Sequence, residues 1–331
     1  MKGIDVVVPC YNYGRYLQQC ADSVLQETDL DVRILIIDDA SSDGSGEEAR
    51  RLAAADNRIE VVVHARNQGH IATYNEGLEW VGQDYMLLLS ADDLVAPGAL
   101  ARAVELMESQ PMIAFVFGRP VRFRTDEELA LAHRGAVQQG SSVLPGWEFV
   151  RRICHTAMNP VETAAAVVRT TVQKRAGGYR AELPHAGDLE MWLRCAAQGD
   201  VGEIAAVQAF VRLHGANMRD GYSGAEFLRD YRQRRDAFEL FFDAVNSPGG
   251  DSLRDQALAS LARDLLWDAS RAVEQGRSCR EILQLALEFR PSVRRTRQYR
   301  RLALKRLLHA VLDTARPPPH PVLEAGGGRA G

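Results

Sequence analysis

The stretch VVVPCYNYGRYLQQCADSVLQETDLDVRILIIDDASSDGS, residues 6–45, holds two apolar runs on either side of a helix-forming segment. The runs Ile4–Val8 and Val32–Ile37 are short and rich in β-branched residues, as buried strands are. The segment between them has apolar residues at the spacing of one helix face, namely Leu17, Cys20, Ala21 and Val24. Strand, helix and strand in this order predict two parallel strands joined by a right-handed crossover.

The same alternation continues outward to about residue 120. Further strands are predicted over residues 59–63, 85–89 and 113–117, and helices over 47–55, 71–81 and 97–110. We expect Pro9 to end the first strand and Pro97 to open the last of these helices. The fold class is therefore α/β, with a mostly parallel central sheet flanked by helices. Polar residues after the first, second and fourth strands are expected to meet at one edge of this sheet.

The chain is less regular after residue 120. The polar stretch Thr125–Ser142 predicts a loop or variable insert, and helices are predicted over 147–154 and 188–198. Residues 224–312 have an almost wholly helical pattern, and the end of the chain, rich in Pro and Gly, is expected to be disordered. We therefore divide the chain into a globular domain, a helical C-terminal extension and a disordered tail, at 1–223, 224–315 and 316–331.

The composition is that of an ordinary globular protein, with 46% hydrophobic and 25% charged residues among 331. The formal net charge of −4 argues against a protein that binds nucleic acid over its whole surface. Residues 224–331 hold 19 basic and 14 acidic side chains, net +5, whereas residues 1–223 hold 21 and 30, net −9. The two parts are therefore suited to different partners.

Three further features bear on the location of the protein. The five cysteines are widely spaced and form no CxxC pair, which excludes a disulfide framework and a thiolate metal site and predicts a cytoplasmic location. The N-terminus enters an apolar strand directly, without the regions of a signal peptide. No apolar run approaches the ~20 residues that span a membrane.

Two motifs follow the first two strands. In PCYNYG, residues 9–14, Tyr11 is suited to stack on a base, and the alternative is a strand-to-helix turn with an incidental tyrosine. The pair Asp38-Asp39 offers acceptors for a base N–H or a ribose hydroxyl, or else caps a helix. A dinucleotide-dependent dehydrogenase is disfavoured, because its GxGxxG motif is reduced to Gly14 after the first strand.

A third motif, SADD at residues 90–93, follows the very apolar segment MLLL. Two adjacent carboxylates, Asp92 and Asp93, repel each other and lose hydration there, and a hard cation relieves both effects. Mg²⁺ or Mn²⁺ would keep coordination positions for phosphate oxygens and neutralise a diphosphate leaving group. The alternative is an N-cap for the helix after Pro97. His64, His70 and Asp92 do not have the spacing of a metal-ligand set.

Two later motifs carry less information when each is taken alone. Asp188, in HAGDLEMWLR, is predicted at the start of a helix, either as a general base or as an N-cap beside a Glu190–Arg194 pair. His214, in RLHGANMR, is either a phosphate contact or a structural histidine.

Taken in order, the motifs resemble those of the inverting family 2 glycosyltransferases of the GT-A fold. The resemblance runs from about Asp5 to Asn217 and rests on VVVPCYNYGRYL, ILIIDDASSDGS, RNQGHIATYNEGL, YMLLLSADD, GGY, GDLEMWLR and RLHGANMR. It implies an enzyme that moves a sugar from a nucleotide-diphosphate donor to a hydroxyl acceptor, which is a glycan, a lipid-linked molecule or a small molecule. It also implies Mn²⁺ or Mg²⁺ as the cofactor, with residues 1–120 holding the donor and 121–223 the acceptor and the base.

The resemblance further implies roles for single residues. The nucleotide-binding positions that it implies are Pro9, Tyr11, Asp39 and Asp92. Asp93 is implied as the metal ligand, with Asp92 beside it, and Asp188 as the base that deprotonates the acceptor. A glycosidase, by contrast, needs two carboxylates flanking the bond. The chain departs from the family pattern at Ser90, where the family often has an acid, and at Gly187, where it often has Glu.

Two other classes of protein stay open. One is a catalytically inactive GT-A domain that binds nucleotide sugars without turnover. The other is a sugar-nucleotide nucleotidyltransferase, whose Gly-rich, basic phosphate loop after the first strand is poorly matched by CYNYGRYLQ.

The segment 289–312 has no acid and eight basic residues, and it ends in an apolar stripe at helical spacing formed by Leu304, Leu307, Leu308 and Val311. It predicts either a peripheral contact with the inner, anionic face of a membrane or a helix docked on the globular domain.

Overall fold

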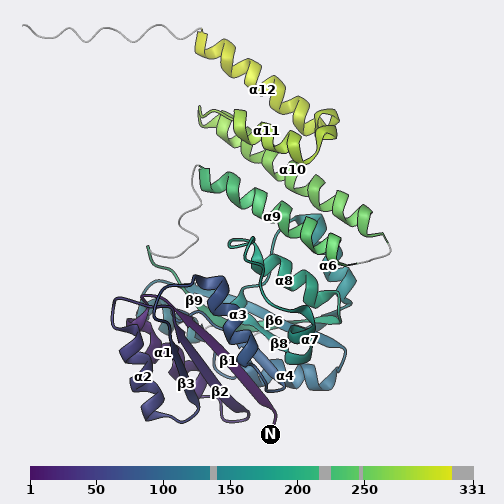
Figure 1. Ribbon diagram of the computed structural model, residues 1–331. Helices are drawn as coiled ribbons and strands as arrows, with labels where there is room; N and C mark the ends of the chain where they lie inside the picture. The colour runs from purple at the N-terminus through teal and green to yellow at the C-terminus, as the bar shows by residue number, and fades with distance from the viewer. Residues whose placement is uncertain (135–139, 216–224, 246–248, 315–331) are drawn as a thin grey trace, which may run out of the picture. The chain divides into compact units, whose positions relative to one another are not determined.

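The computed structural model describes residues 1–134, 140–215, 225–245 and 249–314 (Figure 1). Its centre is a nine-stranded sheet with the order β3-β2-β1-β4-β8-β6-β9-β5, and β7 also pairs with β9. The strands of the first half are β1 (Gly3–Cys10), β2 (Asp31–Asp38), β3 (Ile59–Val63), β4 (Tyr85–Leu88) and β5 (Leu94–Val95). Those of the second half are β6 (Ile113–Phe123), β7 (Ser141–Leu144), β8 (Ala166–Arg169) and β9 (Asp200–Arg212).

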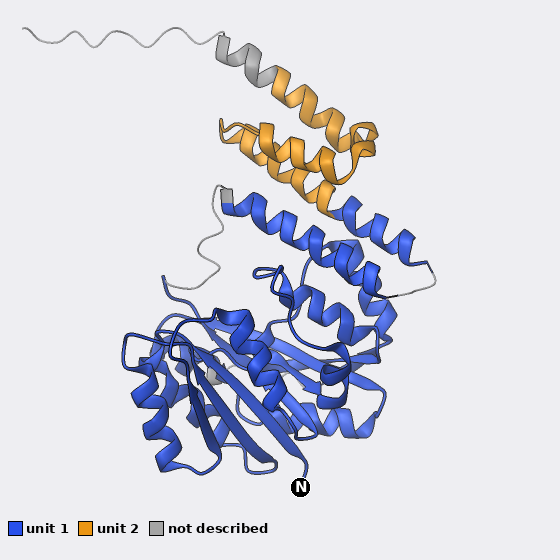
Figure 2. Ribbon diagram, in the orientation of Figure 1, with its two compact units in different colours: residues 1–260 blue, residues 261–331 orange. Residues whose placement is uncertain are grey.

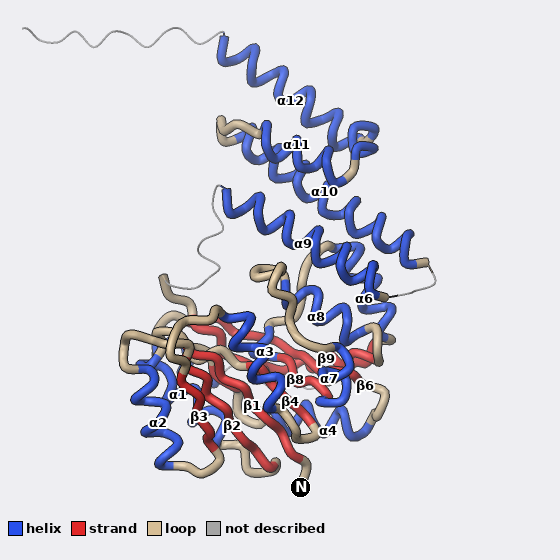
Figure 3. The backbone as a smooth tube through the Cα atoms, in the orientation of Figure 1, coloured by secondary structure: helices blue, strands red, loops and turns tan. Residues whose placement is uncertain are grey.

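The predicted α/β class is confirmed. Strands β1 to β4 are parallel to one another, as are β6 and β9, whereas β8 runs antiparallel between β4 and β6. Figure 3 shows these strands as one layer flanked by helices. The parallel order of β2, β1 and β4 brings the segments that follow these three strands to one edge of the sheet.

The helices that cover the sheet begin close to the residues that the periodicity predicts. They are α1 (Gly14–Leu25), α2 (Ser45–Ala55), α3 (His70–Trp80), α4 (Ala99–Ser109), α6 (Gly146–Thr156) and α8 (Gly187–Ala196). The short helix α7 (Thr170–Ala176) was not predicted from the sequence. Helix α3 lies directly on β1, because a Cβ atom at Gly77 would come within 2.2 Å of a methyl group of Val7. The glycine therefore sets how closely this helix approaches the sheet.

Two expectations about proline are wrong. Pro9 does not end β1, and it pairs in register with Ile37 of β2. In a parallel strand, alternate residues direct their backbone N–H and C=O groups to the same neighbouring strand. The Val7 carbonyl accepts from the Leu89 N–H, on the β4 side, so Pro9, two residues further on, faces the same side. Pro9 therefore faces the side where the β4 ladder has already ended, so its missing N–H costs no ladder bond. Pro97 lies two residues before α4, whose N-cap is Gly98 with φ of 66°.

Of the two alternatives for residues 125–142, the loop is also wrong, whereas the variable insert stays a prediction. Helix α5 (Asp126–Arg134) lies within these residues, and β7 begins at Ser141. The short helix opens with Asp126, Glu127 and Glu128, whose charges suit the positive end of a helix dipole. Residues 135–139 lie outside the described part of the chain.

The described residues of the C-terminal part are almost wholly helical, as predicted. It contains α9 (Ala225–Ala244), α10 (Gly250–Glu274), α11 (Arg280–Phe289), the 3₁₀ helix η3 (Pro291–Arg295) and α12 (Arg297–Thr314). Contacts divide the chain into two compact units, Met1–Ser260 and Leu261–Gly331 (Figure 2). The boundary proposed from the sequence at residue 223 stays a prediction, and the predicted disordered tail, 316–331, lies outside the described residues.

Each unit has its own buried centre. In the first, the core surrounds the strands, with Ile4, Val6 and Ile34 completely buried. In the second, one leucine from each of α10, α11 and α12 is buried, namely Leu265, Leu285 and Leu302, and Lys305 of α12 donates to Ser270 Oγ of α10 at 2.9 Å. None of the described helices is long and apolar enough to cross a bilayer.

Candidate active site

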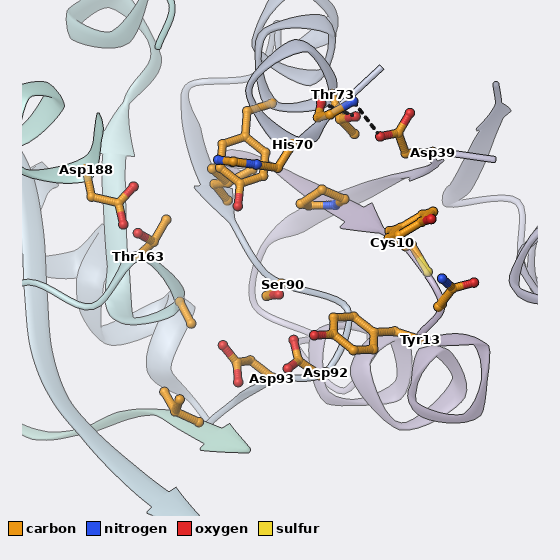
Figure 4. A pocket seen from close by; sticks show the side chains of 18 of the residues that line it. Cys10, Tyr13, Asp39, His70, Thr73, Ser90, Asp92, Asp93, Thr163 and Asp188 are labelled. Carbon is orange, nitrogen blue, oxygen red and sulfur yellow. Dashed lines mark hydrogen bonds between the residues drawn. The ribbon is translucent and has the colours of Figure 1, made fainter. Parts of the chain in front are cut away.

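A cavity of about 750 Å³ opens at the edge of the sheet where β1, β2 and β4 end (Figure 4). Six residues singled out from the sequence line it together, namely Pro9, Tyr11, Asp39, Asp92, Asp93 and Asp188. Figure 4 shows Asp39 on one side of the cavity and Asp188 on the other, with Asp92 and Asp93 in the region between them. The edge predicted from the strand order is therefore hollow and acidic.

The turns after β1 and β2 are tied to each other. Asn12 has φ of 61°, a left-handed conformation that asparagine tolerates better than most residues. Its N–H donates to Ser41 Oγ at 2.8 Å, and its Oδ1 accepts from the Ser42 N–H at 2.9 Å. Tyr11 stays 50% exposed at the cavity wall, which leaves a face of its ring open to a flat ligand.

Asp39 is buried and nearly saturated with donors. Its Oδ1 accepts from His64 Nδ1 and from the Gln68 N–H, both at 2.7 Å, and its Oδ2 accepts from the Gly69 N–H at 2.9 Å. Burial alone raises the pKa of Asp39, but these three hydrogen bonds outweigh it and lower the pKa below its usual value. A carboxylate offers about four acceptor positions, so the contacts within the described residues leave one, on Oδ2.

The Asp92-Asp93 turn is held from behind by the end of β9. The Arg212 N–H donates to Asp93 Oδ1 at 2.9 Å, and Arg212 Nε donates to the Asp92 carbonyl at 3.2 Å. The guanidinium lies between the rings of Tyr16 and Phe123, at 4.5 Å from each centroid. The sequence did not single out Arg212, because it is 119 residues from Asp93 and nothing local indicates that the two meet.

His214 lies against Asp92, with Nε2 at 2.9 Å from Asp92 Oδ2. Its ring stacks on Tyr16 and meets Tyr13 edge-on. Figure 4 shows the Tyr13 hydroxyl pointing toward Asp92. Burial, followed by the charges of Asp92 and Asp93, raises the pKa of Tyr13 to about 12, so this group remains a neutral donor. A phosphate contact by His214 stays a prediction.

The acids fit a divalent cation by their donor chemistry. Among the described residues Asp92 Oδ1 is buried and has no hydrogen-bond partner, which leaves an acceptor facing no donor. Helix capping does not explain it, since α4 is capped by Gly98 without any side-chain bond. The described residues contain no group of three or more acidic, His or Cys side chains arranged for a metal. Two carboxylates suit Mg²⁺ or Mn²⁺ when the ligand's phosphate oxygens and water complete the shell.

Asp188 stands in the first turn of α8 and lines the cavity beside Thr163 (Figure 4). The alternative that Asp188 caps the helix is wrong, because the N-cap is Ala186 and it makes no side-chain cap bond. The predicted Glu190–Arg194 pair exists at 2.7 Å, and neither residue belongs to the cavity lining. Asp188 therefore lies in the cavity lining and is not the N-cap of its helix.

Gly187, the departure from the family pattern, has a steric explanation. A Cβ atom at this position would lie 3.2 Å from the ring of Tyr179, closer than nearly all such contacts. Tyr179 in turn meets Tyr74 edge-on, and Tyr74 lines the cavity. Burial, followed by the charge of Asp188, raises the pKa of Tyr74 well above its usual value. Tyr74 and Thr163 also line the cavity, but nothing in the sequence singles them out. Neither lies in a pattern of acidic or metal-binding residues.

Comparison with known proteins defines the class. Residues 5–169, about half of the chain, match the model of the family described as Glycosyl transferase family 2. The chain belongs to this family, as its motifs implied.

Particular relatives agree with this class. The chain is 38% identical over 93 residues to glycosyltransferase GlyG of Streptococcus pneumoniae serotype 4, a match that covers 28% of this chain and 31% of GlyG. It spans about a third of the length of the first curated relatives that it matches.

Two solved structures share the fold. The crystal structure of S. aureus TarS 1–349 in complex with UDP has a TM-score of 0.62 and 14% identity, over 95% of this chain and 92% of that one. The mannosyltransferase PcManGT from Pyrobaculum calidifontis, in complex with GDP-Man and Mn²⁺, has a TM-score of 0.57 and 17% identity, over 95% of this chain and 84% of that one. These likenesses confirm the GT-A fold.

Proposed function

We propose that the protein is a metal-dependent, inverting glycosyltransferase that moves a sugar from a nucleotide-diphosphate donor to a hydroxyl acceptor. One observation carries this proposal. One cavity is lined by Tyr11 and Asp39, by the acidic pair Asp92-Asp93 and by a separate carboxylate, Asp188, and Figure 4 shows Asp39 and Asp188 on opposite sides with the pair between them. That order matches the order of base, diphosphate and sugar along a donor molecule.

The nucleoside is assigned to the end formed by β1 and β2. The exposed ring of Tyr11 is suited to stack on the base, and Pro9 lines the same wall. Asp39 has one acceptor position left on Oδ2, which suits a single N–H of the base. Pyrimidines with an N3–H and guanine with an N1–H both supply such a donor.

The diphosphate is assigned to the middle of the cavity. Asp93 and Asp92 would hold Mn²⁺ or Mg²⁺, and the bound cation supplies the positive charge that stabilises the departing diphosphate. The neutral hydroxyl of Tyr13 points to the same place and is suited to donate to an oxygen there. Ser90 replaces the first acid of the usual motif, so the chain's own contribution is these two adjacent carboxylates.

The transfer itself uses Asp188 as general base. As the acceptor oxygen attacks the anomeric carbon from the face opposite the diphosphate, its proton passes to an oxygen of Asp188. The bond from the anomeric carbon to the diphosphate oxygen breaks, and the diphosphate leaves with the electron pair. A single displacement of this kind inverts the configuration, and no second protein acid is required.

We also propose a peripheral membrane contact, at the cytoplasmic face, through residues 289–312. In the described part of this segment Leu304 and Leu307 are 60% and 65% exposed, and most of its arginines are exposed as well. Leu304 shares a helix face with three arginines, because side chains three, four and seven residues apart lie on the same face of a helix. These are Arg297, Arg300 and Arg301. That combination suits an anionic lipid surface, where a lipid-linked acceptor would be found.

A thermal-shift panel tests the proposed activity. UDP-, GDP-, dTDP- and CMP-sugars are compared with and without Mn²⁺. One nucleotide class should stabilise the protein, by about 2.7 kcal/mol at 100-fold excess over Kd, and only with the cation. Stabilisation by none of them would contradict the proposal. Binding without turnover against many acceptors would instead favour an inactive nucleotide-sugar-binding domain.

A further inference from the structure

His64 bridges two carboxylates behind the nucleobase end of the cavity. It follows β3 and its side chain is 4% exposed. Its Nδ1 lies 2.7 Å from Asp39 Oδ1, and its Nε2 lies 2.7 Å from Glu76 Oε2 on α3. The ring is therefore fixed at both nitrogens, although His64 does not itself line the cavity.

This geometry decides the protonation state of the ring. A neutral imidazole has one N–H and can donate to one carboxylate only, whereas the imidazolium donates to both. Burial lowers the pKa of His64, but the hydrogen bonds to Asp39 and Glu76 outweigh it and raise the pKa above its ordinary value. The charged groups that act on the ring are these two acids, one from the end of β2 and one from α3.

Two further charged residues lie next to these groups in the chain. Asp38 Oδ2 accepts from the Ser41 N–H, its Oδ1 is buried without a hydrogen-bond partner among the described residues, and Arg66, on the same loop as His64, is exposed to solvent. The backbone N–H of His64 donates to the Asp38 carbonyl at 2.9 Å, which anchors the residue to β2. Loss of the proton from the ring therefore changes its bonds to Asp39 and Glu76 before anything else.

The ring connects to the cavity through Asp39. The Asp39 carboxylate accepts the N–H groups of Gln68 and Gly69, and so fixes the loop in front of α3. Gly69 has φ of 86°, a conformation that few other residues adopt, and it lines the cavity with its neighbours Asn67 and His70. The position of this loop therefore depends on the position of Asp39.

We propose that His64 is a positioning residue whose charged form, clamped by Glu76, fixes Asp39 and the 67–70 loop in the geometry that binds the nucleobase. The inference rests on the proposed function, because it assigns this end of the cavity to the base. When the His64 ring loses a proton, one of its nitrogens presents a lone pair to a carboxylate, and the two repel. Glu76 then turns to water, because its side chain is 41% exposed. Nucleotide binding weakens as this occurs.

The linkage has a definite sign for stability. The pKa of His64 is higher in the folded protein than the unfolded value of about 6.5. Its ion pairs therefore stabilise the fold fully below about pH 6.5, and this contribution is lost as the pH rises through the folded pKa.

The test uses three variants of the full chain. Glu76→Gln keeps the geometry without the charge, since the amide can donate to a neutral Nε2 while Nδ1–H still donates to Asp39. His64→Ala removes the clamp. Glu79→Gln removes the same charge from an exposed position one turn further along α3 and serves as the matched control.

Calorimetry of UDP and GDP with Mn²⁺, between about pH 6 and about pH 8.5 so that the base keeps its N–H, is combined with NMR titration of the His64 ring in the metal-free protein. The wild type and Glu79→Gln should lose affinity in step with the His64 titration. In Glu76→Gln the His64 ring should titrate at a lower pH than in the wild type, yet the affinity for the nucleotide should stay constant over the whole range. His64→Ala should bind the nucleotide about tenfold more weakly than the wild type at low pH.

Affinity that is independent of pH in the wild type and matched by His64→Ala would overturn the inference and leave the proposed function intact. Absence of nucleotide binding by the wild type at every pH would overturn both. An affinity loss in Glu76→Gln that follows the same pH course as the wild type would assign the pH dependence to another group and overturn the inference.

Discussion

Asp188 is the residue on which the proposed chemistry depends most narrowly. It stands in the first turn of α8 and lines the cavity, and the N-cap of the helix is Ala186. Its neighbour Glu190 is buried in ion pairs with Arg180 and Arg194 and holds the helix in place. In the proposed mechanism, the structural role and the chemical role are thus divided between two acids two residues apart.

This division makes Asp188→Asn an informative change. The amide cannot take a proton from the acceptor, so we expect kcat to fall by about 10²–10⁴-fold while nucleotide binding and folding are kept. Initial rates of donor consumption and calorimetry with the nucleoside diphosphate measure the two effects separately. Glu182→Gln, an exposed acid outside the cavity lining, is the control. A collapse of donor affinity with kcat preserved would make Asp188 a binding residue.

At the scale of elements, the N-terminal half could be predicted because each element carries its own periodicity. The runs that form β1 to β4 are short and apolar, and α1 shows its buried face at Leu17, Cys20 and Val24. Pro9, Tyr11, Asp39, Asp92 and Asp93 could be singled out for a related reason, since they lie at or just after the ends of those strands, whereas Tyr74 and Thr163 could not.

The second half could not be predicted in the same way. Strand β8 has four residues and lies antiparallel between β4 and β6, so its pairing depends on partners far along the chain. The pairing of β9 with β6 changes register between Gly118 and Pro120 of β6. Buried and exposed residues do not alternate regularly along β9, so its sequence lacks the two-residue period typical of a strand. Arg212 and His214, at and just after the end of this strand, hold the acidic turn. Their contacts could not be predicted because the position of the strand could not.

The packing of α3 on β1 gives a prediction at this scale. In Gly77→Ala the new methyl group would lie 2.2 Å from Val7 Cγ1, inside the central sheet. Overpacking of this kind costs about 1–3 kcal/mol, and a shift of α3 also displaces the cavity residues His70 and Tyr74. Chemical denaturation should show a lower free energy of unfolding than in Gly82→Ala, where the nearest atom is 3.9 Å away. Equal stability of the two variants would contradict the packing argument.

At the scale of the whole molecule, charge separates the two ends of the chain. Residues 1–223 carry net −9 and hold the acidic cavity, whereas residues 224–331 carry net +5. The exposed arginines and leucines near the start of α12 belong to the second compact unit. A membrane contact through this unit would bring the enzyme to lipid-linked acceptors.

Co-sedimentation with liposomes measures that contact. The full chain should bind vesicles that contain anionic lipid, release them as salt rises, and bind neutral vesicles weakly. Arg300→Glu with Arg301→Glu should bind less than the control pair Arg50→Glu with Arg66→Glu, which makes the same change in net charge from exposed positions near the sheet. Equal binding by both pairs, or none by the folded wild type at low salt, would leave α12 as a docking helix.

The central claim is that the cavity binds a nucleoside diphosphate through a cation held by Asp92 and Asp93. Calorimetry of UDP and GDP, with Mn²⁺ and after its removal by a chelator, tests it most directly in the wild type and in Asp93→Asn. Asn keeps an oxygen that accepts the Arg212 N–H, so the variant should fold. We expect the wild type to bind one nucleotide at least about tenfold more tightly with Mn²⁺, a difference of about 1.4 kcal/mol, and Asp93→Asn to lose that difference. Binding by the wild type that is the same with and without Mn²⁺, or an undiminished Mn²⁺ effect in Asp93→Asn, would contradict the account.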